Sequence, residues 1–181
     1  MAARRRIRPG NALPDWKTAR TRRPILILGS LDGVETGVRQ LIRSKPLETT
    51  RIKVGDSRVT LPTLAEMLRI KAALVLARNA TRDFIDFAAL AHGLGERAIA
   101  ALARMDQLYP QPRGGSTLQQ LLRQLSEPRP YDLAGLNLES YKGLAPRWRN
   151  WETVVEECAR VAVRLAEGLL RKRRRPRATL R

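Results

Sequence analysis

Four charged residues lie close together among hydrophobic ones in the middle of the sequence. Lys71 falls on the apolar stripe of a predicted helix, and Arg82, Asp83 and Asp86 follow it in the segment RNATRDFID, residues 78–86. An unpaired ammonium group on a buried stripe is costly, so Lys71 must reach solvent or meet an acid. Two carboxylates opposite a lysine are typical either of an ion-pair network between two helices or of a catalytic site. The residue types alone leave both interpretations open.

The elements that must position these residues begin with strands. The apolar run at 25–28 predicts a short buried strand, and 35–46 predicts a short helix closed by a proline. Alternating residues at 50–61, around a Gly-Asp-Ser turn, predict a hairpin. The fold class expected is therefore α+β, with a small antiparallel or mixed N-terminal sheet followed by a mostly helical C-terminal region.

All segments after Pro62 are predicted to be helical. Thr63 and Glu66 form a capping box that begins a helix ending near Ala77. The apolar stripe of this helix, with Lys71 at its centre, comprises Leu64, Met67, Leu68, Leu74 and Val75. Further helices are predicted at 81–93, 96–108, 118–125 and from Asn150, its N-cap, to about Leu169.

The net charge of +18 is concentrated at the two ends of the chain. Residues 1–23 and 171–181 each carry a net charge of +7, which leaves +4 for residues 24–170. We therefore expect a basic disordered leader at 1–23, a single α+β domain at 24–170 and a basic tail at 171–181. Within the domain, strands and a short helix occupy 24–62, and helices occupy 63–170.

Basic residues also suggest nucleic-acid contacts. The two tails could attract phosphates in a salt-dependent way, or could be solvated ends without a partner. Lys142, Arg147, Trp148 and Arg149 lie near Tyr141 and Trp151, a composition that could stack on RNA bases and clamp the backbone. In the alternative interpretation the tryptophans attach the last helix to the body of the domain.

Composition excludes several classes of protein. No apolar run approaches the roughly 18 residues that a membrane-spanning helix needs, so we expect no membrane partner. The N-terminal arginines have no apolar segment behind them, which argues against a secretory signal and for a cytoplasmic location. One cysteine and one histidine can form neither a disulfide framework nor a zinc site.

The segment VTLPTLAEMLRIKAALVLARNATRDFIDFAALAHGLG resembles nucleotidyltransferase toxins of the AbiEii/AbiGii type, an abortive-infection and toxin–antitoxin family. Its features are a helix lysine followed by an R-D-x-x-D motif. YKGLAPRWRNWETVVEECARVA also looks like the C-terminal helical region of one bacterial branch of that family. The resemblance covers roughly residues 24–170, is most specific at 58–94, and corresponds to the C-terminal portion of such a toxin.

The resemblance implies transfer of a nucleoside monophosphate from an NTP to an RNA or protein acceptor, with Mg²⁺ held by carboxylates. It implies that Lys71, Asp83 and Asp86 are catalytic and that Lys71, Arg78 and Arg82 face the nucleotide phosphates. A cognate antitoxin and a tRNA acceptor are the partners it implies.

The chain departs from the family's pattern at the metal site. Gly29-Ser30 could begin a phosphate-binding turn, but residues 39–43, where the family has its Asp-x-Asp pair, contain no acid. The strand at 25–28 contains none either, so we find no metal ligands and expect a truncated protein that is inactive alone. The alternatives are a non-catalytic nucleic-acid-binding or antitoxin-partner module that uses the basic tails, and a helical scaffold in which the Lys71 cluster is structural.

Overall fold

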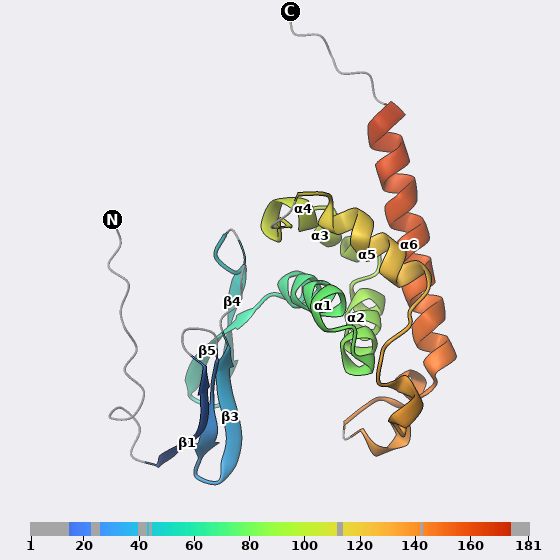
Figure 1. Ribbon diagram of the computed structural model, residues 1–181. Helices are drawn as coiled ribbons and strands as arrows, with labels where there is room; N and C mark the ends of the chain where they lie inside the picture. Colours follow the sequence, from blue (N-terminus) through green and yellow to red (C-terminus); the bar gives the residue numbers. More distant parts are fainter. Residues whose placement is uncertain are drawn as a thin grey trace, which may run out of the picture. The chain divides into compact units, whose positions relative to one another are not determined.

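The computed structural model describes residues 15–22, 26–39, 43, 45–111, 114–141 and 143–174 (Figure 1). The chain divides into two compact units, Met1–Ile42 and Arg43–Arg181. The expected α+β fold class is confirmed, because the described residues form two small antiparallel sheets followed by a helical region.

The first unit is a three-stranded antiparallel sheet in the order β1-β2-β3, made of β1 (Trp16–Arg22), β2 (Leu26–Leu31) and β3 (Val34–Arg39). The helix expected at 35–46 is wrong for residues 35–39. Asp32 and Gly33, at φ 51° and 76°, form the two-residue turn of a hairpin, and such turns demand an antiparallel return strand. Disorder of the leader is also wrong for residues 16–22, which form β1.

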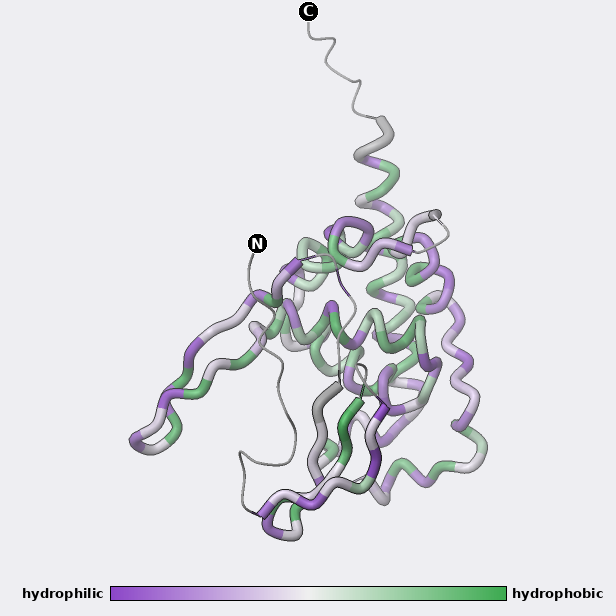
Figure 2. The backbone as a smooth tube through the Cα atoms, turned by 60° about the vertical axis from the view of Figure 1, so that its left-hand side comes forward, coloured by the Kyte–Doolittle hydropathy of each residue, from purple (hydrophilic) through white to green (hydrophobic). Residues whose placement is uncertain are grey.

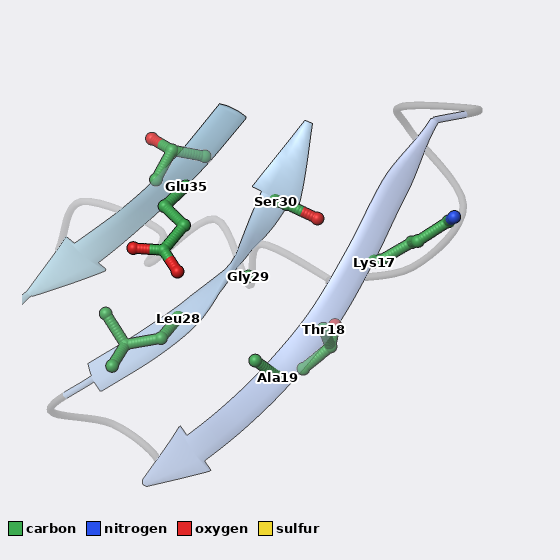
Figure 3. A pocket seen from close by; sticks show the side chains of 8 residues that line it. Lys17, Thr18, Ala19, Leu28, Gly29, Ser30 and Glu35 are labelled. Carbon is green, nitrogen blue, oxygen red and sulfur yellow. The ribbon is translucent and has the colours of Figure 1, made fainter. Parts of the chain in front are cut away.

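Gly29 lies inside β2 and not in a phosphate-binding turn. A Cβ at this position would come within 2.4 Å of the Lys17 carbonyl oxygen and 2.6 Å of the Trp16 ring, so glycine allows β1 to approach. A shallow hollow over this part of the sheet is shown in Figure 3, where the Lys17 ammonium points away from the Glu35 carboxylate. The two charges therefore do not converge on a ligand there.

The second unit begins with the predicted hairpin, which is confirmed as β4 (Thr49–Val54) and β5 (Ser57–Pro62). Gly55, at φ 56°, takes the first position of its two-residue turn. Ile52 pairs with Val59 on one face, while Lys53 pairs with Arg58 on the other.

The helices follow in the order predicted. They are α1 (Leu64–Arg78), α2 (Thr81–Leu94), α3 (Glu96–Leu102), α4 (Met105–Leu108), α5 (Thr117–Ser126) and α6 (Trp151–Arg174), with short 3₁₀ turns η1 (Leu133–Gly135), η2 (Leu138–Ser140) and η3 (Pro146–Arg149) before α6. The Thr63 side chain accepts a hydrogen bond from the Glu66 amide, and Asn150 accepts one from the Glu152 amide, so both predicted N-caps are confirmed. One helix was expected at 96–108, and the structure has two, α3 and α4.

The buried face of α1 differs from the predicted stripe. Leu64 and Met67 are exposed, whereas Glu66 and Arg69 are fully buried beside Leu68. The stripe is rotated because the two charged side chains have partners in the interior and can therefore be buried. The main core packs α1 and α2 against α5 and α6, and includes Leu68, Val75, Phe84, Phe87, Leu121, Val154 and Leu165.

A buried charge network surrounds Glu66. The Glu66 carboxylate forms ion pairs with Arg43 and with Arg69, whose Nη2 lies 3.0 Å away. It also accepts hydrogen bonds from the Tyr109 hydroxyl at 3.3 Å and from the Glu48 amide at 3.2 Å. Arg69 also pairs with the Glu48 carboxylate. The network thereby joins the chain before β4 to α1 and α4.

The pKa values reflect this pairing. The hydrogen bond from Arg69 is the main cause that holds the pKa of Glu48 below its ordinary value. Burial raises the pKa of Glu66, but the contacts from Arg69, the Glu48 amide and Arg43 outweigh it, so that this pKa is also lowered. Burial raises the pKa of Tyr109 to about 12.

No helix among the described residues is both long enough and apolar enough to cross a membrane. Even α6, the longest, alternates between hydrophobic and hydrophilic residues along its length (Figure 2).

We predict that Glu66→Ala lowers the free energy of unfolding by about 3–5 kcal/mol, because it leaves buried arginine charges unpaired. Since folding lowers the pKa values of Glu48 and Glu66, their contribution is present above pH 4.5 and is lost as the pH falls below it. Urea unfolding of the unsubstituted chain and of Glu66→Ala, each at neutral and at acid pH, measures the effect of the substitution and the effect of acidification on the free energy of unfolding. The control is Glu139→Ala, which removes an exposed partner of Arg149 and should cost less than about 1 kcal/mol. Equal losses in the two variants would contradict a buried network.

Candidate functional site

The predicted charged cluster lies between α1 and α2. The Lys71 Nζ is 2.7 Å from Asp86 Oδ2 and 3.5 Å from Asp83 Oδ1. Asn79, at φ 47°, ends α1 in the left-handed conformation, and its amide bonds the Val75 carbonyl. This cap lets α2 begin two residues later and return along α1, which brings the acids to the lysine.

Two arginines complete the cluster. Arg78 Nε lies 3.3 Å from Asp83 Oδ2, and Arg82 Nε lies 3.1 Å from Asp86 Oδ1. Asp83 is buried, whereas the Lys71 side chain is 26% exposed and so is not an uncompensated buried charge. Asp83 Oδ2 has no hydrogen bond of good geometry, and its nearby partner is the Arg78 cation.

Every carboxylate oxygen of Asp83 and Asp86 therefore faces a cation. Ion pairing of this kind fixes the helix packing and leaves no open pair of oxygens for a divalent metal. In the described part of the chain, no three His, Cys, Asp or Glu side chains are grouped so that they could hold a metal ion. The catalytic and phosphate-binding roles of these residues, and the Mg²⁺ and NTP that go with them, stay predictions.

A residue that the sequence reasoning missed completes the start of α2. The N-cap residue, Ala80, has no side-chain group to offer, and Asp132 takes its place. Its Oδ1 accepts hydrogen bonds from the Thr81 amide at 2.8 Å and the Thr81 hydroxyl at 2.7 Å. Burial raises the pKa of Asp132, but the two bonds from Thr81 outweigh it and lower the pKa overall. No local signal could identify this cap, because its donor and acceptor are 51 positions apart.

Of the residues proposed for nucleic-acid contact, Trp148 is used inside the fold. Trp148 is buried and packs edge-on against His92, with ring centroids 5.6 Å apart, so it is not free to stack on a base. Trp151 packs edge-on against Phe84, and Arg149 Nη1 lies 2.9 Å from Glu139. The packing alternative is therefore confirmed for both tryptophans.

The other predicted residues are placed as follows. Arg147 is exposed, with its guanidinium 5.3 Å from the Trp148 ring centroid. Lys142 lies outside the described residues. Cys158 is buried in α6, as expected of a core residue, and burial raises its pKa to about 12.

Comparison with known proteins gives a different relationship from the one the motif suggested. The chain is 35% identical over 130 residues to the mycolic acid-containing lipids exporter MmpL11 of Mycolicibacterium smegmatis. It is 38% identical over 130 residues to the probable transport protein MmpL11 of Mycobacterium bovis and to the heme uptake protein MmpL11 of Mycobacterium tuberculosis. The match covers 69% of this chain and 13% of each relative, so the chain corresponds to a small part of these proteins. No model of a known protein family matches the chain, and no solved structure matches it.

These relatives overturn the resemblance to AbiEii/AbiGii nucleotidyltransferase toxins, and with it the predicted nucleotidyl transfer and the toxin–antitoxin context. The alternative of a nucleic-acid-binding or antitoxin-partner module gains no support from them either. A continuous match over 69% of the chain necessarily includes its middle, where α1 to α4 lie. The Lys71 cluster and Glu66 thus belong to the region shared with membrane transport proteins.

For the Lys71 cluster we predict a structural role that a double-mutant cycle can measure. Lys71→Ala should lower the free energy of unfolding by about 1–3 kcal/mol, because Asp83 loses one partner in a buried position. Lys71→Ala combined with Asp83→Ala should show a coupling of about 1–2 kcal/mol. Arg97→Ala, at an exposed position of α3, is the control and should change stability little. A gain in stability in Lys71→Ala would instead indicate a lysine reserved for a ligand.

Proposed function

We propose that this chain is an extramembrane module of a membrane transport system of the MmpL11 kind. One observation carries the proposal, the 35% and 38% identity over 130 residues to proteins named as an exporter and as transport proteins. The relatives' names mention mycolic acid-containing lipids and heme. Those names describe the whole relatives, of which the match covers 13%.

A structural role agrees with how the chain uses its charges. Asp83 and Asp86 are neutralised by Lys71 and two arginines, and Glu66 is neutralised by Arg43 and Arg69. Acids paired in this way hold neighbouring elements of a helical unit together. We infer that this helical unit positions neighbouring parts of a transporter.

We also propose that the module lies on the cytoplasmic side of the membrane. The chain carries 35 lysines and arginines against 17 acids, and the excess is concentrated in its two ends. The anionic lipids of the cytoplasmic leaflet attract such basic segments.

A segment replacement in Mycolicibacterium smegmatis tests the function. In MmpL11, the region that aligns with this chain is replaced by the chain's own residues, and the protein is produced in cells that lack MmpL11. We expect the chimera to restore export of mycolic acid-containing lipids, and deletion of the region to abolish it. The same chimera with Glu66→Ala should fail, since its fold is weakened. A chimera that reaches the membrane in normal amounts but behaves like the deletion would refute the proposal.

Reporter fusions test the side of the membrane. Green fluorescent protein joined to the chain within the MmpL11 chimera should fluoresce, whereas alkaline phosphatase at the same place should stay inactive because its disulfides do not form in the cytoplasm. The two fusions should be compared at equal protein levels. Phosphatase activity together with a dark fluorescent fusion would place the module on the opposite side.

A further inference from the structure

An apolar groove lies between the N-terminal part of α5 and the C-terminal part of α6. It has a volume of about 270 Å³ and is lined by Gln119, Leu122, Ala166, Leu169 and Leu170. Four of the five side chains are hydrophobic, and Leu170 is 59% exposed. We call these five residues the α5–α6 groove.

The groove lies where α6 leaves the core. The buried positions of α6 are Val154, Glu157, Cys158, Val161, Ala162 and Leu165, and beyond Leu165 none of the described side chains is buried. Figure 1 shows this end of α6 extending past α5. Val163, Ala166 and Leu170 follow one another at spacings of three and four, so they form one apolar stripe. Val163 is 58% exposed, and the stripe therefore continues the groove along the outside of the helix.

Cations follow directly on the apolar residues. Leu170 precedes Arg171, Lys172, Arg173 and Arg174, with which α6 ends, and Glu167 is the nearest acid before them. Arg164 is neutralised by Glu96 of α3. The helix dipole favours cations in a last turn, but it does not require an exposed leucine and an apolar groove beside them. An apolar stripe flanked by Lys and Arg is the chemistry of a helix that lies in the interface of an anionic bilayer.

We propose that the α5–α6 groove, with the apolar stripe and basic end of α6, docks on the surface of an anionic phospholipid membrane. Leu170 and Val163 enter the boundary between headgroups and acyl chains, while Arg171, the first cation of the basic end, contacts lipid phosphates. Charge complementarity selects this occupant, because a second copy of the chain would bring a like-charged end against the groove. The inference goes beyond the proposed function and does not require it.

Sedimentation of the full chain with vesicles tests the docking surface. The probe is a set of vesicles made of equal parts phosphatidylglycerol and phosphatidylcholine, compared with vesicles of phosphatidylcholine alone. We expect binding to the anionic vesicles that weakens as salt is added. Leu170→Ser should weaken this binding about tenfold, through the loss of buried apolar area. Arg171→Gln with Lys172→Gln should weaken it about thirtyfold.

Matched control variants distinguish vesicle binding by the α5–α6 groove from non-specific binding by other exposed residues. Leu64 is 57% exposed at the start of α1, so Leu64→Ser removes a comparable side chain elsewhere and should leave binding unchanged. Arg51→Gln with Lys53→Gln removes two exposed charges from β4 and should reduce binding only slightly. Circular dichroism confirms that each variant is folded.

Three results would overturn the inference. The first is equal binding to both kinds of vesicle, and the second is an equal loss in Leu64→Ser and Leu170→Ser. The third is a dimer in analytical ultracentrifugation that Leu170→Ser dissociates while vesicle binding persists, since a second copy would then fill the groove. Vesicle binding by a chain that fails in the MmpL11 chimera would leave the docking surface standing and refute only the transport role.

Discussion

Glu66 is fully buried in α1, and its charge is tolerable only because Arg43 and Arg69 reach it. A buried carboxylate that loses its cations costs more than most single contacts contribute, so these partners must be in place together. Glu48 and Tyr109 complete the network and tie the hairpin and α4 to α1. With α1 oriented in this way, Lys71 projects toward α2 and gathers Asp83 and Asp86. The position of α2, on which α6 packs, therefore depends on the charges around Glu66.

The sequence predicted well those features whose cause is local. Thr63 and Asn150 were correctly identified as N-caps, since a cap and its amide are two or three residues apart. The β4–β5 hairpin was also predicted, from its alternating residues. The strand β3 was missed although Asp32-Gly33 is a strong hairpin signal, because the residues after it were interpreted by helical spacing alone.

Ion-pair partners that are distant in the sequence could not be predicted from the spacing of residues within one helix. Glu66 and Arg69 look like surface residues of a helix, and only Arg43 and Glu48, which precede the hairpin, explain why they are buried. The same limit explains the wrong family assignment. A helical hairpin that holds its acids between a lysine and two arginines reproduces an R-D-x-x-D pattern for reasons of packing, so the pattern carries less functional information than its charge suggests.

The Asp132–Thr81 contact has a consequence for the order in which the chain folds. The α1–α2 pair is close in sequence and can form early, but the first amide of α2 is bound by a carboxylate 51 positions away. Closing so long a loop is slow compared with forming a helical turn. We therefore expect the start of α2, with Asp83 in its first turn, to gain its cap after the α1–α2 pair has formed. A loop distant in sequence thus caps the turn that holds Asp83.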